Sequence, residues 1–361
     1  MTVRVNKPAF NIREKLSELE RPIGVKGSEL MKSDTAQEAR DFVSAGRKNM
    51  IINGDMRVSQ RGTSFTINSS SGVNYTLDRF RLYHGNVSST GTVTRNSSNG
   101  LNEHANSLKF ECTGGASSVD ATDDCWIRYI VETLDMPNYG WPSNQYMTLS
   151  FWARSNRVGK HSVAIVSGNF QSQHYNHAYN LQNNVWKHVK ISIPPPTSWT
   201  INGDNGLRIY WPLAIGSSYV TSTVDRWVYN TNDFVVSGVQ QIQGVAGATF
   251  EITGVQLEVG KNATDFERRH YGEELALCQR YYWQQENFLW LYSLDAAHGY
   301  VRANVFYPVE MRAAPTVTGT FSNAGSANGF QSITKKHTIP YVNTPGSGLA
   351  DISNLKFDAE L

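Results

Sequence analysis

The sequence is short of cysteine and of long apolar runs. It has 3 cysteines among 361 residues, and no two of them form a C-x-x-C pair. So few cysteines exclude a disulfide framework and a zinc ribbon. We therefore expect Cys112, Cys125 and Cys278 to be free thiols, with a Cys112–Cys125 bridge as the alternative. No apolar run approaches the roughly 18 residues that span a bilayer, and the first residues lack the apolar core of a secretion signal, so no membrane insertion is expected.

The sequence also has little charge. Lys and Arg number 33 and Asp and Glu 31, which gives a formal net charge of +2. A balanced chain lacks the basic surface of a duplex-binding protein, so nucleic acid is excluded as the main partner. Charged residues make up 18%, whereas the chain has 9 Trp, 17 Tyr, 15 Phe and 29 Gly. This composition is typical of β-rich extracellular or virion proteins rather than of a metabolic α/β enzyme.

Residues 1–48 carry the clearest helical pattern. Apolar residues recur at i, i+4, i+7 and i+11, at Ile12, Leu16, Leu19 and Ile23. This spacing is an a/d seam of about two heptads, and so short a helix is marginal alone in water. We therefore expect the seam to pack against copies of the same chain or in a docking groove, with packing on its own domain as the alternative. A second helix is predicted from the capping box at 35–38 to Gly46.

Residues 49–266 alternate apolar and polar side chains with a period of two. In one such run, Leu149 and Phe151 alternate with Ser150 and Trp152. Many short alternating runs, separated by Gly- and Asn-rich turns and with no helices between them, predict an antiparallel β-sandwich. The alternation slips at Gly254, which predicts a β-bulge in the last strand.

Residues 267–361 are predicted to form a linker helix and a small β unit. The helix is expected from Glu273 to about Gln284, and strand-like runs follow at 300–306 and 315–318. About 75 residues is small for an all-β domain that builds its own core. We therefore expect this unit to pack on the sandwich or on other subunits.

The sequence carries no catalytic signature. The motifs G-x-S-x-G, H-E-x-x-H, G-x-G-x-x-G and the P-loop are all missing, so we expect a protein that is not an enzyme. His174 and His177 do not converge on one metal ion at this spacing, which favours a surface loop. Asp120, Asp123 and Asp124 lack the glycine and terminal Glu of an EF-hand loop, which favours a solvated turn.

A series of motifs follows the order and spacing of one protein family. They are NMIINGDM at 49–56, QRGTSF at 60–65, YTLDRF at 75–80, LSFWARS at 149–155, ITGVQLEVG at 252–260, FERR at 266–269, LCQRYY at 277–282 and PVEMRAAP at 308–315. Together they resemble the tail-fibre and related fibre proteins of tailed bacteriophages, many from cyanobacterial and marine phages, over about residues 4–320.

The resemblance implies a virion structural protein, assembled in the host cytoplasm and released by lysis. It implies a jelly roll like that of a carbohydrate-binding module at 49–266, and a homotrimer, which agrees with the seam. Residues 1–48 would attach to other virion proteins of the tail, baseplate or capsid. Such jelly rolls often hold a structural calcium ion, for which the resemblance points to Asp55; no other cofactor is implied. The last strand departs from the pattern, because Thr253-Gly254 stand where an acidic pair is usual.

Aromatic residues are the candidates for ligand contact. Flat rings stack on the C–H faces of sugars, while neighbouring Asn, Asp and Arg side chains hydrogen-bond the hydroxyl groups. The candidates for glycan binding are Trp141, Trp152, Trp199, Trp227 and Tyr229. The alternative is that each ring anchors a loop or a subunit interface, where Trp and Tyr are enriched.

The sequence thus predicts a non-enzymatic phage fibre protein that presents a β-sandwich to host-surface polysaccharide. A trimer would multiply weak contacts through effective concentration. A purely structural capsid fibre, cement or baseplate component without a ligand is the first alternative, and a glycan depolymerase is the second.

Overall fold

The structure is a computed structural model. It describes residues 48–361 apart from 69–71, 86–88, 116–118, 137–144, 169–172, 197–198, 200–202, 230–231, 233, 286, 294–299, 325–326 and 344–347. The seam residues and the predicted helices before Lys48 lie outside the described residues. The chain divides after Lys48, so the rest of the described structure belongs to one unit, Asn49–Leu361. In this part of the chain, no helix is long and apolar enough to cross a membrane.

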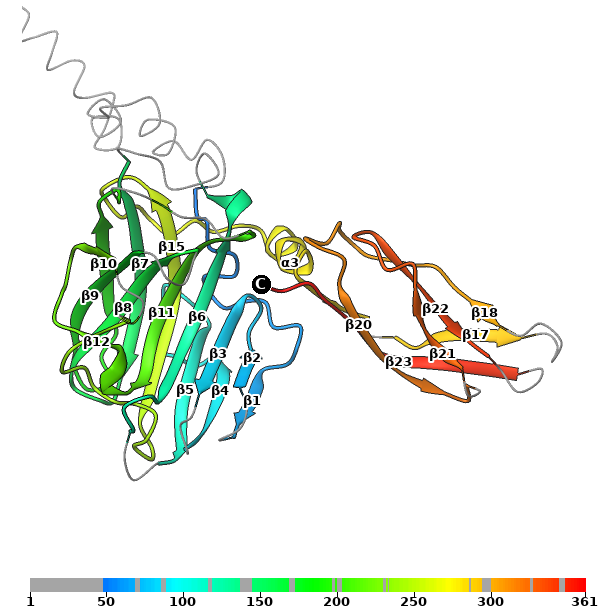
Figure 1. The fold of residues 1–361 in the computed structure, drawn as a ribbon, viewed down its shortest axis with the longest axis horizontal. Coiled ribbons are helices and arrows are strands. Elements are labelled where there is room, and N and C mark those ends of the chain that lie inside the picture. The colour runs from blue at the N-terminus through cyan, green and yellow to red at the C-terminus, as the bar shows by residue number, and fades with distance from the viewer. Residues whose placement is uncertain are drawn as a thin grey trace, which may run out of the picture. The chain divides into compact units, whose positions relative to one another are not determined.

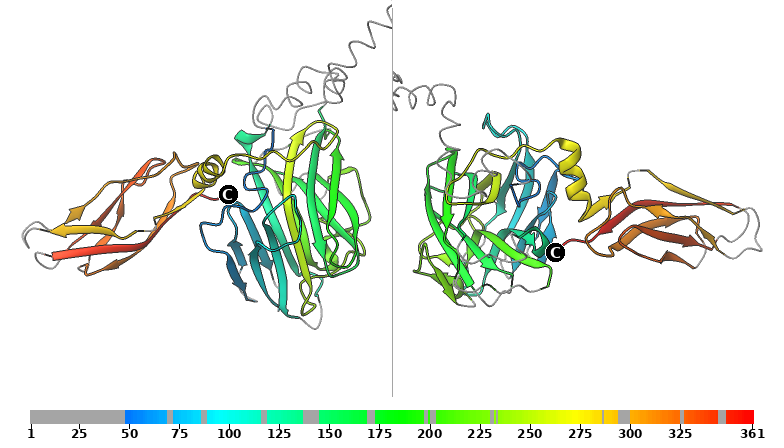
Figure 2. Two further views of the ribbon diagram at one scale, coloured as in Figure 1. Left: turned by 180° about the vertical axis from the view of Figure 1, so that it is seen from behind. Right: turned by 90° about the horizontal axis from the view of Figure 1, so that it is seen from above.

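Two antiparallel sheets form the first part of this unit (Figures 1 and 2). The first sheet has the order β1 (Ser64–Ile67), β4 (Thr90–Asn96), β5 (Ser107–Gly114), β15 (Thr249–Val259), β7 (Met147–Ser155) and β10 (Lys187–Ile193). The second has the order β13 (Trp227–Tyr229), β9 (Gln173–Leu181), β8 (Gly159–Ser167), β11 (Asn205–Ile215), β6 (Asp124–Glu132), β3 (Phe80–Gly85) and β2 (Gly72–Tyr75). The connections contain the parallel pair β12 (Val220–Thr221) and β14 (Val235–Val236) and the 3-10 helices η1 (Thr133–Asp135) and η3 (Ser217–Tyr219).

The strand order is that of a jelly roll. The neighbours β5, β15, β7 and β10 lie in one sheet, and β6, β11, β8 and β9 lie in the other. From β5 to β15 the chain changes sheet at nearly every step, which is the eight-stranded, double-sheet jelly-roll arrangement. The predicted antiparallel sandwich is therefore confirmed, and the strand order supplies the jelly-roll topology that the family resemblance implied.

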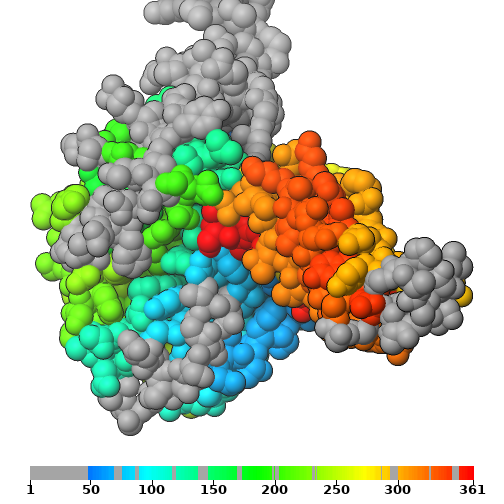
Figure 3. Space-filling view, turned by 45° about the vertical axis from the view of Figure 1, so that its right-hand side comes forward, coloured from blue at the N-terminus to red at the C-terminus, as the bar shows by residue number. Residues whose placement is uncertain are grey.

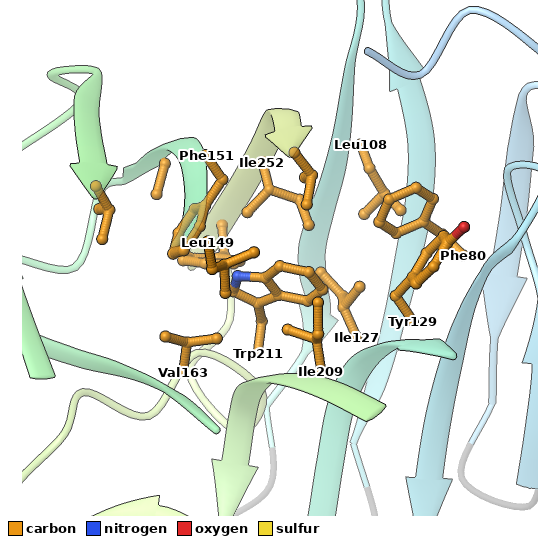
Figure 4. Packing of buried hydrophobic residues seen from close by; sticks show 14 of the residues in the cluster. Phe80, Leu108, Ile127, Tyr129, Leu149, Phe151, Val163, Ile209, Trp211 and Ile252 are labelled. Atoms are coloured by element: carbon orange, nitrogen blue, oxygen red, sulfur yellow. The ribbon is translucent and has the colours of Figure 1, made fainter. Parts of the chain in front are cut away.

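The period-two pattern explains the core between the sheets. Phe151 of β7 lies edge-on to Trp211 of β11, with ring centroids 5.7 Å apart. Phe80 lies 5.0 Å from Tyr129 at the other side of the same cluster (Figure 4). These four rings are at most 1% exposed, and burying each stabilises the fold by about 1.5–3 kcal/mol. The three cysteines are buried and free, as predicted.

The predicted bulge at Gly254 is confirmed. The register of β15 against β7 shifts between Thr253 and Gln256. Gly254 has a φ of 59°, in the left-handed region where a residue without a Cβ carries no steric penalty. The bulge re-aims the outer face of the strand at the point where it passes the 99–106 segment.

The linker helix is shorter than predicted. Helix α3 (Tyr271–Gln279) ends before residues 282–284, which form strand β16 (Tyr282–Gln284) instead. These three residues pair with Lys356–Asp358 at the far end of the sequence. The prediction of helix to Gln284 is therefore wrong, because a non-local strand pairing overrides the local helical pattern there.

Residues 282–361 form a smaller β unit with its own core. One sheet has the order β16, β23 (Gly348–Asp358) and β17 (Leu289–Ser293), with β20 (Thr316–Ser322) also paired to β23. The other has the order β18 (Val301–Arg302), β22 (His337–Val342) and β19 (Val305–Phe306), with β21 (Asn328–Gln331) also paired to β22. Met311, Ile352, Leu355 and Phe357 are fully buried in this unit.

The last residues of the chain contact the sandwich. The buried carboxylate of Glu360 pairs with the buried guanidinium of Arg79. Arg81 and Tyr75 donate to the backbone oxygen of Leu361, at 2.8 Å for Arg81. In Figure 3 the red C-terminal residues accordingly lie between the blue-to-green sandwich strands and the orange strands of the smaller unit.

Motifs that carry the family resemblance meet at one buried junction. The backbone N–H of Asn53, in motif 49–56, donates to Oε1 of Glu274 on α3 at 2.5 Å. Arg269, in motif 266–269, lies 3.2 Å from the same carboxylate. Both charged side chains are at most 4% exposed. These motif residues hold the start of the sandwich to α3, so their role here is structural.

Candidate functional site

A pocket of about 320 Å³ opens on the outer face of the first sheet. It is lined by Trp152 of β7, His188 of β10 and Gly254 of β15, and by residues 103–104, 263–266 and 268 from outside the strands. Trp152 faces outward because its neighbours Phe151 and Ala153 are buried in the core and side chains alternate along a strand.

The aromatic surface in the pocket comes from a cross-strand pair. Trp152 and His188 are directly opposite in the β7–β10 ladder, so their side chains share one face of the sheet. Their rings stack with centroids 4.6 Å apart and planes inclined by 14°. The pair forms a half-buried platform that is larger than the indole alone.

Local hydrogen bonds fix the two segments beside this platform. The side chain of Asn99 donates to the carbonyl of His104 at 3.0 Å and accepts from the N–H of Leu101 at 2.8 Å. On the other side, the carboxylate of Glu258 accepts from the N–H of Thr264 at 2.9 Å and from its hydroxyl at 2.6 Å. The pocket is therefore preformed by short-range polar contacts.

A buried histidine closes one side of the pocket. His104 is 3% exposed, and its ring lies edge-on to Phe266 with centroids 4.8 Å apart. A Cβ at position 254 would lie 2.4 Å from Nε2 of His104, so only glycine fits beneath this ring. Nδ1 of His104 has no hydrogen-bond partner in the described structure.

The two histidines of the pocket are neutral at pH 7. Burial, with smaller contributions from Arg268 and other nearby positive groups, lowers the pKa of His104 to about 4. Burial and the neighbouring Lys190 lower the pKa of His188 to about 4 as well. A neutral imidazole offers one donor and one acceptor. Glu103, Asp265, Arg268 and Lys190 add charges of both signs around the platform.

Three of the other predicted glycan-binding residues lie away from this pocket. Trp227 and Trp199 pack against the core with ring centroids 5.6 Å apart, and Nε1 of Trp227 donates to Pro194 O at 2.7 Å. Tyr229 is 78% exposed on edge strand β13. Trp141 lies outside the described residues. Of the four candidates that the structure describes, Trp152 alone lines the pocket.

Asp55, the calcium candidate, is buried beside a cation. Its Oδ2 lies 2.6 Å from Nε of Arg57, and burial raises its pKa. Across the described residues, no group of three or more His, Cys, Asp or Glu side chains is arranged to hold a metal ion. The Arg57 guanidinium thus lies against one oxygen of this carboxylate, and the other, Oδ1, is buried with no hydrogen-bond partner in the described structure.

Two local predictions from the sequence are wrong. His174 and His177 lie on strand β9, where His174 is fully buried and Nδ1 of His177 is 2.6 Å from Asp225, rather than on a surface loop. Asp120 is exposed beside the turn at 121–122, as predicted, whereas Asp123 and Asp124 are 4% and 7% exposed, so the predicted solvated turn is wrong for these two. Burial and the charge of Asp123 raise the pKa of Asp124 to about 7. In both cases long-range pairing of the flanking strands buries residues whose local sequence is polar.

Sequence reasoning did not identify His104, His188 and Phe266 as pocket residues. His188 shows a weak signal, since it lies on the polar phase of a strand with Lys190 and Ser192. His104 and Phe266 lie in irregular segments, where no periodicity marks the direction of a side chain.

No family model and none of the curated proteins matches the chain. Several solved structures are similar to part of it. A putative sugar-binding protein from Bacteroides thetaiotaomicron is 12% identical over 58% of this chain and 99% of its own, with a TM-score of 0.30. A family 11 carbohydrate-binding module from Clostridium thermocellum is 13% identical over 56% and 98%, with a TM-score of 0.28. A cyclase from Fischerella sp. is 10% identical over 60% and 98%, with a TM-score of 0.32. Such likenesses carry no conclusion about the ligand of this chain.

Proposed function

We propose that this protein is a fibre-type virion protein of a tailed phage that binds host-surface carbohydrate through the pocket on the outer face of the jelly roll. The observation that carries the binding site is the stacked Trp152–His188 pair, because it offers a flat aromatic surface within a polar pocket. A sugar ring lies with its C–H face on such a surface and directs its hydroxyls to the polar groups around it.

The pocket fits sugar hydroxyls better than a single strong charge. Neutral His188 and His104, the hydroxyl of Ser150 and the carboxylates of Glu103 and Asp265 supply donors and acceptors. Opposite charges are balanced, two against two, when Lys190 and Arg268 are included. This mixture favours a neutral or zwitterionic glycan as the ligand.

The virion part of the proposal is supported by the motif series in the sequence. Residues 1–48 would attach the chain to other virion proteins and assemble a homotrimer through the seam. Three pockets on one particle would turn weak single contacts into firm adhesion through effective concentration. The chain would bind without cleaving its ligand.

Glycan binding can be tested with the intact protein on a glycan array, followed by calorimetry with the best soluble oligosaccharide. We expect Trp152→Ala to weaken binding at least tenfold, which is about 1.4 kcal/mol, without changing the melting temperature by more than a few degrees. Tyr229→Ala is the matched control, because it removes an exposed ring from the other sheet.

Three results would contradict the proposal. An array without bound sugar would favour a purely structural virion component. Equal affinity of wild type and Trp152→Ala would remove the pocket as the binding site. Release of reducing ends from host polysaccharide would indicate a depolymerase instead of an adhesin.

A further inference from the structure

A row of exposed aromatic rings follows strand β17 in the C-terminal unit. Phe288, Trp290 and Tyr292 are 55%, 58% and 61% exposed, whereas Leu291, which points the other way, is 3% exposed. Because side chains alternate along a strand, these three aromatic side chains lie on the same outward face. Single exposed apolar residues are ordinary on a protein surface, but a contiguous set marks a site of interaction.

The neighbouring strands place polar side chains beside this row. Trp290 is opposite Asp351 in the β17–β23 ladder, and Asp351 is opposite Ser322 in the β20–β23 ladder. Thr320 is opposite Ser353 in the latter ladder. Residues that are directly opposite share a face, so an aromatic row on β17 borders hydroxyls and a carboxylate on β23 and β20.

Asp351 offers a free acceptor in this face. Its side chain makes no ion pair or hydrogen bond with any part of the chain that the structure describes. Both carboxylate oxygens can therefore accept hydrogen bonds from the hydroxyl groups of a ligand that lies against Trp290.

We propose that the outer face of β17 is a second carbohydrate-binding site, which takes an extended, neutral oligosaccharide along the strand. The ring centroids of Phe288 and Trp290 are 5.9 Å apart and their planes are inclined by 34°, so they form a nearly continuous surface. Same-face residues along a strand are about 6.6–6.8 Å apart. Three rings therefore extend over roughly 13 Å, enough for a short run of sugars.

The composition of the face favours a sugar chain over a protein partner. The three rings lie in one line along β17. On the neighbouring strands the row is bordered by the carboxylate of Asp351 and by hydroxyl side chains, with exposed Leu349 as the apolar neighbour opposite Tyr292. A protein interface core is a wider patch that is depleted of charge. The lone carboxylate also disfavours acidic glycans, because a second negative charge would repel it.

The site is separate from the sandwich pocket, and it rests on the proposed function only in the class of its ligand. The test uses the intact protein and linear neutral hexasaccharides of glucose, xylose and galactose, with oligogalacturonate as the acidic comparison. Calorimetry and quenching of tryptophan fluorescence measure binding. We expect Trp290→Ala to weaken binding of at least one neutral hexasaccharide tenfold or more.

Two further variants make the expectation specific. Asp351→Asn keeps the shape of the side chain and removes its charge, and we expect it to weaken the same hexasaccharide at least threefold. Phe306→Ala, which removes a 71% exposed ring from the other sheet of this unit, should leave binding unchanged. The melting temperature of each variant shows whether the fold is kept.

Comparison with the pocket separates the two sites. If Trp290→Ala lowers the number of hexasaccharides bound per chain, and Trp152→Ala leaves this Trp290-dependent binding unchanged, the β17 site stands on its own. If Trp290→Ala binds the hexasaccharides as tightly as wild type does, the β17 site is overturned and the proposal for the pocket is unaffected. A lower oligomeric mass of Trp290→Ala, with unchanged sugar binding, also overturns it, because the face would then be a contact between subunits.

Discussion

Single residues decide the shape of the pocket, and they differ in how far the sequence reveals them. The outward direction of Trp152 follows from its position between Phe151 and Ala153 in an alternating strand. Its stacking on His188 depends on the register of β7 against β10, which the alternation within each separate segment does not reveal. The sequence therefore predicts the outward ring of Trp152 but not its stacking partner, His188.

At position 254 we predict that a methyl group is costly for two separate reasons. Gly254→Ala places a side chain at a φ of 59° and a Cβ 2.4 Å from Nε2 of His104. We expect the free energy of unfolding to fall by about 2–4 kcal/mol, from backbone strain plus displacement of the ring. Urea unfolding monitored by tryptophan fluorescence measures the loss.

Gly247 provides the matched control for this change. Its φ is 78°, yet a Cβ there would meet nothing within 4 Å. Gly247→Ala should therefore cost only the backbone strain, about 1 kcal/mol. Equal losses at positions 247 and 254 would show that His104 moves aside freely, and that it does not hold the side of the pocket.

We also predict that His104 makes stability depend on pH. The pKa of His104 is about 4 in the fold and near 6.5 in an unfolded chain. Between these values only the unfolded chain binds the proton. The contribution of neutral His104 is therefore complete above pH 6.5 and is lost as the pH falls toward 4.

The measurement compares wild type with His104→Phe, which keeps a ring beside Phe266. We expect the free energy of unfolding of wild type to fall between pH 7 and pH 4.5 by about 2 kcal/mol more than that of the variant. Parallel pH profiles for the two proteins would mean that the buried ring already carries its proton, contrary to the expectation.

At the scale of elements, the sequence predicts strands well and their partners poorly. Alternation at 147–154 marks β7, and the slip at Gly254 marks the bulge in β15, because both depend on neighbouring residues. The end of α3 was misplaced, since residues 282–284 join a ladder with Lys356–Asp358. Burial of Asp124 was missed for the same reason: its strand pairs with residues that are distant in the sequence.

Helix α3 supplies a prediction about the motif residues. Glu274 is buried, accepts from the backbone of Asn53 and pairs with Arg269. Removing the charge of Glu274 leaves Arg269 with Glu267, 3.0 Å away, as its ionic partner. Loss of one charge-assisted contact to a buried guanidinium costs about 1.5–3 kcal/mol. We expect Glu274→Gln to lower the free energy of unfolding by that amount while sugar affinity stays constant.

Glu273 is the control within the same turn of α3, because its side chain is exposed. Glu273→Gln should change stability by less than about 0.5 kcal/mol. If Glu274→Gln instead abolished sugar binding in a protein of normal stability, the motif junction would be part of a binding site and not only a structural joint.

For the whole molecule, the motif series contributes to both the buried junction and the pocket. The backbone N–H of Asn53 in motif 49–56 and the buried side chain of Arg269 in motif 266–269 both contact Glu274 of α3. Motif 149–155 supplies Trp152 to the pocket, whereas its stacking partner His188 and the rings of the β17 row lie outside the motifs. The proposed sugar surface of the pocket therefore combines a motif residue with a residue outside the series.

The proposed role requires the chain to assemble into a trimer. The seam of Ile12, Leu16, Leu19 and Ile23 spans two heptads and has little stability alone. We predict that the intact protein is a trimer by light scattering, and that Leu16→Asp with Leu19→Asp yields monomers with an unchanged jelly roll. Glu18→Gln, on another face of the same helical pattern, should remain trimeric.

The monomer and the trimer should have equal affinity for a soluble oligosaccharide. Retention on a glycan-coated surface should fall at least a hundredfold in the monomer, because avidity needs simultaneous contacts. A wild-type protein that is monomeric and adheres equally well would refute the fibre assignment.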